Sequence, residues 1–135
     1  MNGVAKDITE AFAETPIYMA PEVLRGEKYD SKADIYSMGL MFWELSYGTM
    51  VSLDIPANLK REEVLRRVEE GYQPKFGGEV PVKGGSLYKW IQLMKKCWAK
   101  DPKPRPTAKD CGKLIDEVEK CYEDEQETFL MVVSV

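Results

Sequence analysis

One segment constrains the fold of this chain more than any other. Residues 31–48 read SKADIYSMGLMFWELSYG, and their apolar side chains occur around the whole helical wheel instead of along one stripe. A helix of this kind has to be enclosed by other elements. Ser31 with Asp34 three residues later matches the capping-box pattern, and Gly48 is a typical helix stop. We therefore expect a mainly α fold around a central buried helix from Ser31 to Tyr47.

The segment from Lys60 to Glu70 predicts a second and much more polar helix. Its sequence, KREEVLRRVEE, offers only Val64, Leu65 and Val68 to a core. We expect the other faces of this helix to meet water or a protein partner.

Two amphipathic helices are predicted in the last third of the chain, because apolar residues recur three or four positions apart. They contain, respectively, Leu87, Trp90, Ile91, Met94, Cys97 and Trp98, and Cys111, Leu114, Ile115 and Val118. Thr107 is the predicted N-cap of the second, with Asp110 three residues later. Before them, residues 72–85 contain two Gly pairs and two Pro, which predict an irregular loop of variable conformation.

Composition fits one folded domain and narrows the classes of partner. The chain has 135 residues, of which 44% are hydrophobic and 31% charged, as in soluble globular proteins. A net charge of −4 produces no field that attracts nucleic acid. No apolar run is long enough to cross a membrane. We expect neither a nucleic acid partner nor a membrane span.

Histidine and cysteine usage argues against several kinds of catalysis. The chain has no histidine, which removes Ser-His and Cys-His nucleophilic pairs and histidine bases. Its three cysteines, Cys97, Cys111 and Cys121, form no C-x-x-C pair. An odd number of cysteines in a sequence without a signal peptide indicates reduced thiols in a cytoplasmic protein. For these three cysteines, packing in the core is favoured over metal binding or disulfide formation.

Three segments, in the same order, resemble protein kinases. TPIYMAPEV (15–23) is similar to the substrate-positioning and A-P-E segment, and DIYSMGLMFWEL (34–45) to the long central helix. CWAKDPKPRPT (97–107) resembles a stretch near the end of the C-terminal lobe, in the form typical of tyrosine-kinase-like serine/threonine kinases. The resemblance covers residues 1–122 and implies a partial kinase domain with the helices of the C-terminal lobe. Residues 123–135 then form a tail that begins with acidic residues and ends with apolar ones.

The resemblance assigns substrate binding to Thr15, Pro16 and Tyr18. Thr15 matches a threonine that lies near the accepting hydroxyl in serine/threonine kinases, which implies serine/threonine specificity. A local hydrogen bond from Thr15 to the backbone is the alternative role. Glu14 departs from the glycine that the family usually has at this position. Thr9 lies in the segment that resembles the activation segment and is a candidate phosphosite.

Four residues have predicted structural roles. Glu22, the glutamate of A-P-E, implies a buried bidentate ion pair with Arg105. Asp34 has two possible roles, one in capping together with Ser31 and one as the family's buried aspartate, which accepts hydrogen bonds from the catalytic loop. Trp43 is expected to be a core aromatic residue.

The groups that transfer phosphate in kinases are not found in these 135 residues. The sequence contains no Gly-rich loop, no strand lysine and no H-R-D-x-x-x-x-N loop. MNGVAK at the start is similar to D-F-G-V-A-K, with Met1 in the position of the aspartate that binds Mg²⁺ and Asn2 in place of phenylalanine. A thioether does not bind a hard cation. We expect no metal or cofactor in this chain, whereas the parent domain would use ATP and Mg²⁺.

Three functional hypotheses follow. The favoured one is a catalytically incompetent fragment of a serine/threonine kinase domain, either a partial gene product or a short isoform. The second is a pseudokinase-like module that binds a protein substrate or kinase partner through the substrate loop and the helix from Lys60. The third is an active enzyme assembled with a separate chain that supplies the catalytic loop.

Overall fold

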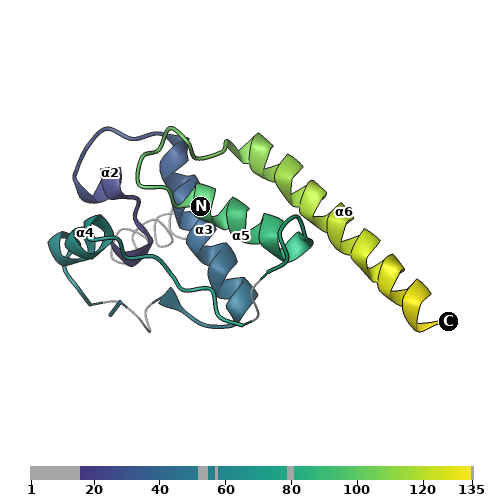
Figure 1. Ribbon diagram of the computed structural model, residues 1–135. Helices are drawn as coiled ribbons and strands as arrows, with labels where there is room; N and C mark the ends of the chain where they lie inside the picture. The colour runs from purple at the N-terminus through teal and green to yellow at the C-terminus, as the bar shows by residue number, and fades with distance from the viewer. Residues whose placement is uncertain (1–15, 52–54, 57, 79–80, 135) are drawn as a thin grey trace, which may run out of the picture.

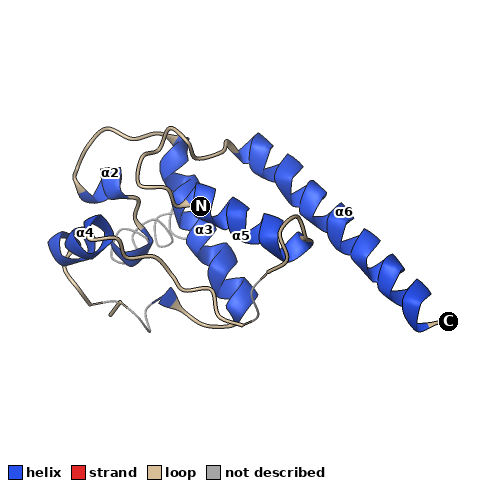
Figure 2. Ribbon diagram, viewed as in Figure 1, coloured by secondary structure: helices blue, strands red, loops and turns tan. Residues whose placement is uncertain are grey.

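The structure is a computed structural model that describes residues 16–51, 55–56, 58–78 and 81–134. In these residues the chain forms helices and no strands (Figure 2). The elements are η1 (Pro16–Tyr18), α2 (Pro21–Leu24), α3 (Ser31–Tyr47), α4 (Arg61–Glu69), α5 (Ser86–Cys97) and α6 (Ala108–Val133). The predicted mainly α fold is confirmed.

Helix α3 lies in the middle of the molecule and crosses α5 (Figure 1). The short α2 packs on α4 on one side of this crossing, and α6 packs on α5 on the other. The helix begins and ends where the sequence predicted, because Gly48 adopts a φ of 63° and donates its N–H to the Glu44 carbonyl oxygen (2.9 Å). Only glycine reaches that backbone region without strain.

The N-terminal cap of α3 differs from the prediction. Asp30, not Ser31, is the N-cap, and its Oδ1 accepts a hydrogen bond from the Lys32 N–H (2.9 Å). Asp30 has the extended backbone that an N-cap needs, whereas Ser31 is already helical. The Ser31–Asp34 capping box is therefore wrong.

Helix α3 is central but is not enclosed on all sides. Its buried residues include Leu40 and Trp43, which belong to the main hydrophobic core. Met41 is exposed, however, and Leu45 is 83% exposed. The prediction of an enclosed helix is correct for one side of α3, and the other side carries apolar groups at the surface.

The closest approach of α3 and α5 depends on Gly39. A Cβ atom built on Gly39 would lie 2.6 Å from the Cβ of Cys97, closer than two carbon atoms can approach. Cys97 in turn lies beside Cys111 of α6, with 3.9 Å between the two Sγ atoms. This small-residue contact joins the three helices, and together with Ile35 and Leu93 the two cysteines form a second core cluster.

The loop after α4 is irregular, as predicted, but its first half packs on the core. Phe76 stacks on Trp98 and meets Tyr47 edge-on, with ring centroids 5.6 Å and 5.9 Å apart. The indole N–H of Trp43 donates to the Lys75 carbonyl oxygen (3.0 Å). These contacts attach Lys75 and Phe76 to α3 and to Trp98, which directly follows α5.

Helix α6 is longer than the sequence pattern indicated. Thr107 is its N-cap, as predicted, with Oγ1 accepting from the Asp110 N–H (3.1 Å). The helix continues to Val133 without interruption, through the residues predicted to form a tail. Figure 1 shows its C-terminal half extending away from the other helices. Of the helices in the described residues, none has the length and apolarity needed to cross a bilayer.

Candidate functional site

Glu22 and Arg105 join the start of the described chain to its last third. Arg105 Nη1 lies 2.7 Å from Glu22 Oε2, and Nη2 lies 2.9 Å from Oε1. Both side chains are buried, with exposed fractions of 4% for Glu22 and 1% for Arg105. The predicted ion pair is present and has the bidentate geometry of a strong charge-assisted contact.

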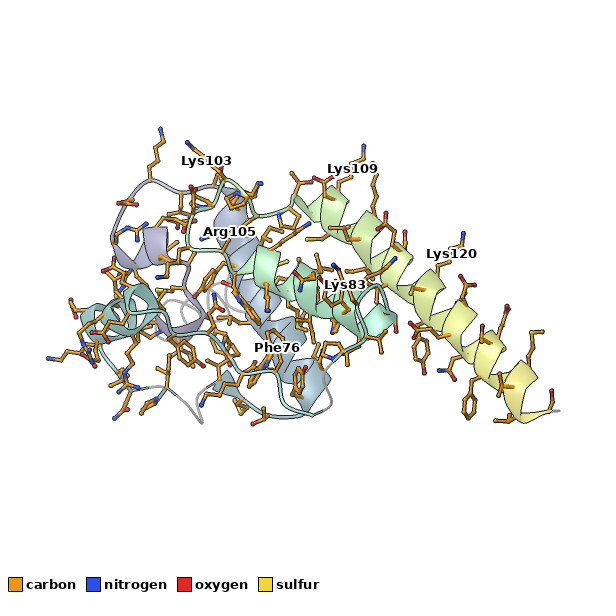
Figure 3. The ribbon with its side chains drawn as sticks, in the orientation of Figure 1. Phe76, Lys83, Lys103, Arg105, Lys109 and Lys120 are labelled. Carbon is orange, nitrogen blue, oxygen red and sulfur yellow. The ribbon has the colours of Figure 1, made fainter. Side chains whose placement is uncertain are left out.

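The Arg105 guanidinium uses all of its hydrogen-bond donors. A guanidinium has five N–H groups, and two of them bind Glu22. The other three donate to backbone carbonyl oxygens of Ala99 (2.8 Å), Lys32 (3.0 Å) and Lys100 (3.2 Å). Lys32 Nζ donates back to the Arg105 carbonyl oxygen. The site therefore connects α2, the start of α3 and the loop before α6; Figure 3 labels Arg105 there.

Tyr36 forms one wall of this ion-pair site. Its ring centroid lies 5.2 Å from the guanidinium carbon of Arg105, within the range of a cation–π contact. Burial raises the pKa of Tyr36 to about 12; the charge of Arg105 acts in the opposite direction and that of Glu22 in the same direction. The phenol is therefore neutral at physiological pH.

The segment predicted to bind substrate is attached to α3 through Tyr18, by its side-chain hydroxyl and by its backbone carbonyl oxygen. The Tyr18 hydroxyl donates to Glu44 Oε2 (2.7 Å), and Ser37 Oγ donates to the Tyr18 carbonyl oxygen (2.6 Å). Glu44 Oε2 also accepts from the Val51 N–H (2.8 Å). Burial, followed by the hydrogen bond to Glu44, raises the pKa of Tyr18 to about 12. Pro16, two residues earlier, is buried in η1.

Sequence reasoning did not find Ser37 or Glu44. The signal that was available is weak: each is a polar residue in a helix that otherwise reads as apolar. Their roles depend on which segment packs against α3, and the sequence of α3 alone does not show this.

Two predicted residues of this region, Thr9 and Thr15, lie outside the described residues, as do Met1, Asn2 and Glu14. Thr15 is adjacent in sequence to the buried Pro16.

Asp34 does not have the local role predicted for it. The residue is exposed, and no hydrogen bond or ion pair to its side chain occurs in the described part of the chain. It borders a cavity of about 500 Å³ between η1, α2 and α3, which is also lined by Tyr18, Val23, Met41 and Arg61. Among the described residues, the Asp34 carboxylate thus lines this cavity without a side-chain partner.

The described residues do not fit a metal centre. They contain no cluster of three or more Asp, Glu, Cys or His side chains that could hold an ion. Mg²⁺ needs carboxylate oxygens together with phosphate or water, so we derive no chemical step through Mg²⁺ or ATP in this part of the chain.

Two of the three thiols pack in the core. Cys97 and Cys111 are buried and unpaired by disulfides. Burial raises the pKa of Cys97 to about 12 and also raises the pKa of Cys111. Because the thiolate is the reactive form, neither cysteine is suited to nucleophilic chemistry.

Comparison with known proteins identifies the family. A model of the protein kinase domain matches residues 2–114. The chain belongs to the protein kinase domain family. Members of this family transfer the γ-phosphate of ATP, with Mg²⁺, to protein substrates.

The relatives include serine/threonine and dual-specificity kinases. The probable serine/threonine-protein kinase drkB of Dictyostelium discoideum is 33% identical over 111 residues, covering 82% of this chain and 15% of that protein. The dual serine/threonine and tyrosine protein kinase of Danio rerio is 35% identical over 96 residues, or 68% of this chain and 10% of that protein.

The human dual specificity testis-specific protein kinase 2 is 34% identical over 118 residues, which cover 87% of this chain and 19% of that protein. The matched region thus spans less than a fifth of the length of each of these three kinases. The predicted protein kinase relationship is confirmed.

Proposed function

We propose that residues 1–122 form part of the helical, substrate-binding C-terminal lobe of a serine/threonine protein kinase domain of the tyrosine-kinase-like type. The supporting observation is the buried Glu22–Arg105 pair, which holds the A-P-E segment on α3 and the loop before α6. The CWAKDPKPRPT sequence supports the subtype, and the serine/threonine kinases among the relatives support the specificity.

We assign substrate positioning to Thr15, Pro16 and Tyr18. The hydrogen bonds of Tyr18 to α3 supply a rigid base for this segment, because its hydroxyl and carbonyl oxygen are both engaged. Tyr18 then acts by positioning the neighbouring residues. Thr9 is a candidate phosphosite in the preceding segment. The three free thiols agree with a cytoplasmic location.

The 135 residues alone are proposed to be catalytically incompetent. The sequence contains neither the phosphate-cradling Gly-rich loop nor the H-R-D base, and the described residues hold no carboxylate cluster for Mg²⁺. Phosphoryl transfer depends almost entirely on positioning and charge stabilisation by these groups.

Calorimetric titration of the purified chain with Mg-ATP tests this proposal, together with phosphate incorporation into a serine/threonine peptide mixture. We expect no binding in the micromolar range and no incorporation, while an intact serine/threonine kinase domain, assayed in parallel, shows both. Micromolar binding of Mg-ATP, or incorporation by the chain alone, would contradict the proposal.

A second candidate function is protein binding without chemistry. The cavity of about 500 Å³ supports it, since it lies beside the substrate segment and is bordered by Arg61 at the start of α4. A Met41→Asp variant places a charge in this cavity at an exposed position. If the cavity docks a protein segment, this variant should weaken binding of serine/threonine peptides measured without ATP, and the exposed Leu45→Asp variant should not.

A further inference from the structure

The C-terminal half of α6 carries apolar side chains that have no partner in the described part of the chain. Phe129, Leu130, Met131, Val132 and Val133 are between 59% and 71% exposed. Figure 1 shows this part of α6 extending past the end of α5. Neither the ion-pair site nor the substrate segment uses this surface.

Part of this apolar surface continues a groove between α5 and α6. The groove has a volume of about 450 Å³, and its apolar lining comes from Leu87, Trp90, Ile115, Val118 and Tyr122.

Along α6, the positions after Tyr122 at helical spacing are Gln126, Phe129 and Val133, which lie on the same face. We call Tyr122, Phe129 and Val133 the α6 stripe. Groove and stripe form one elongated apolar surface along α6.

Glu125 fixes the position of α6 next to this groove. Its carboxylate accepts hydrogen bonds from the Ser86 backbone N–H (2.7 Å) and from Ser86 Oγ (2.6 Å), at the first turn of α5. The two helices are therefore joined at the point where the groove meets the α6 stripe.

A row of acids runs beside the apolar surface. Glu119, Glu123 and Glu127 follow each other at intervals of four residues, so they lie on one edge of α6. All three are exposed, and Glu119 also lines the groove. We call these residues the acidic row. Figure 3 shows Lys109 and Lys120 of α6 pointing away from α5. Lys120, three residues before Glu123, lies beside the acidic row on the side away from the groove.

The charge pattern argues against two occupants. If a second copy paired with α6 in the antiparallel direction, its acidic row would lie against the first row, and like charges repel. In a parallel pair, the acidic row of one copy would lie against the opposite edge of α6 in the other copy, the edge that contains Glu125. That edge is not available, because Glu125 already binds Ser86 of α5. Helices that lie on anionic membranes carry Lys and Arg beside their apolar face, the opposite of this arrangement.

We propose that the groove, the α6 stripe and the acidic row together bind an amphipathic helix of a partner protein, with an apolar face bordered by Lys or Arg. An elongated apolar groove accepts side chains at positions i, i+3, i+4 and i+7 of such a helix. The basic border of the partner lies along the acidic row, which sets its direction and increases its association rate.

Fluorescence anisotropy with the 135-residue chain tests this proposal. The probe is a labelled peptide of about 18 residues, or five helical turns, with a Leu stripe bordered by Lys. One comparison peptide has the same composition in scrambled order, and another has Glu in place of Lys. We expect the first peptide to bind at least about tenfold more tightly than either comparison peptide, with affinity falling as salt rises.

Variants of the chain separate the two parts of the surface. Phe129→Ser with Val133→Ser removes exposed apolar groups of the α6 stripe, and a triple change of Glu119, Glu123 and Glu127 to Gln removes the charge of the acidic row. Each should weaken binding of the Lys peptide by about tenfold or more, and only the Gln variant should lose the salt dependence. Leu45→Ser, at an exposed apolar site on α3, is the matched control and should change binding less than twofold.

Three outcomes would overturn the proposal. The Lys peptide and its scrambled form could bind equally, which would mean that charge alone attracts them. The chain could form dimers in sedimentation that Phe129→Ser with Val133→Ser abolishes, which would make a second copy the occupant. Vesicles of phosphatidylcholine with phosphatidylserine could bind the chain more tightly than the Lys peptide does, which would make the surface a lipid contact.

Discussion

Arg105 shows how one side chain can hold several segments together. Its five N–H groups bind one carboxylate and three carbonyl oxygens from separate parts of the chain. Lysine has the same charge but only three donors and no planar fork. Arg105→Lys should therefore lower the free energy of unfolding substantially, although less than Arg105→Ala, and urea melts of the two variants measure the difference. Equal stability of Arg105→Lys and the parent chain would contradict this role.

Tyr36 makes stability depend on pH in the alkaline range. Its pKa is raised to about 12 in the folded chain by burial, whereas an unfolded tyrosine ionises near pH 10. The unfolded state therefore loses its proton first, and stability is complete below pH 10 and declines as the pH rises from about 10 to about 12. Between these limits the loss due to Tyr36 is about 2–3 kcal/mol.

The measurement is a series of urea melts from pH 8 to the alkaline limit, on the parent chain and on Tyr36→Phe. The parent should lose more stability above pH 10 than the variant does, since the variant cannot ionise at this position. Parallel curves for the two proteins would show that Tyr36 is not buried as the structure has it.

Single residues were predictable from sequence where a local pattern or a motif identified them. Thr107 and Gly48 took the cap positions that their residue types favour, and the motif resemblance paired Glu22 with Arg105. The N-cap of α3 was predicted wrongly, because Asp30 and Ser31 are both good caps and the backbone decides between them. The Tyr18–Glu44 hydrogen bond could not be predicted, since it depends on how η1 crosses α3.

At the level of elements, the crossing of α3 and α5 depends on the absence of a side chain at Gly39. Alanine usually stabilises a helix interior by about 0.5–1 kcal/mol relative to glycine. At Gly39, however, the added Cβ would lie 2.6 Å from the Cβ of Cys97. We expect Gly39→Ala to destabilise the chain by about 1–3 kcal/mol, because the two helices must separate.

Gly112 supplies the matched control for this prediction. It lies in α6, and a Cβ added there meets no atom within 4 Å. Gly112→Ala should therefore stabilise the chain by about 0.5–1 kcal/mol. Thermal melts of both variants compare the two sites, and a stabilising Gly39→Ala would show that α3 and α5 do not approach as closely as described.

The helices should also differ in their rates of amide hydrogen exchange. Helix α3 contributes Leu40 and Trp43 to the main core, whereas α4 buries only Val64 and Val68. Amides with few buried neighbours open more readily, so those of α3 should exchange more slowly than those of α4. Faster exchange in α3, measured by mass spectrometry or NMR, would contradict its central position.

Elements were predicted well where the apolar period was regular and less well where it stopped. The bounds of α3 followed from its sequence pattern and Gly48, and the position of α5 followed from its apolar spacing. Helix α6 exceeded the prediction because residues 123–127 are polar and offer no face to a core. Glu and Gln are nevertheless good helix formers, so the helix continues beyond its packed part. The exposure of one side of α3 could also not be predicted. Apolar residues all around a helix do not show which of its sides other elements cover.

At the level of the whole molecule, the segment that we propose positions the substrate is held by contacts that do not involve the groups of phosphoryl transfer. Tyr18 and Ser37 attach it to α3, and Glu22 attaches it to Arg105, 83 residues later in the chain. This arrangement explains how the segment can keep its position in a chain that we propose to be inactive alone.

The most direct test of this account is the coupling energy between Glu22 and Arg105, from urea melts of Glu22→Gln, Arg105→Ala and the double variant. Removing one partner leaves a buried, unpaired charge or donor, which should cost about 3–5 kcal/mol. This is a large share of the usual 5–15 kcal/mol of total stability, so the melts are made with sucrose as a stabilising osmolyte. Arg66→Ala on α4, in an exposed ion-pair network, is the control and should cost much less.

The account predicts that the double variant is more stable than the sum of the two single losses implies, by about 1.5–3 kcal/mol. Exchanging the charges, with Glu22→Arg and Arg105→Glu together, should restore part of the loss from either single exchange. A coupling energy of zero within error would mean that the two residues do not meet. The placement of the substrate segment on the C-terminal helices would then be wrong.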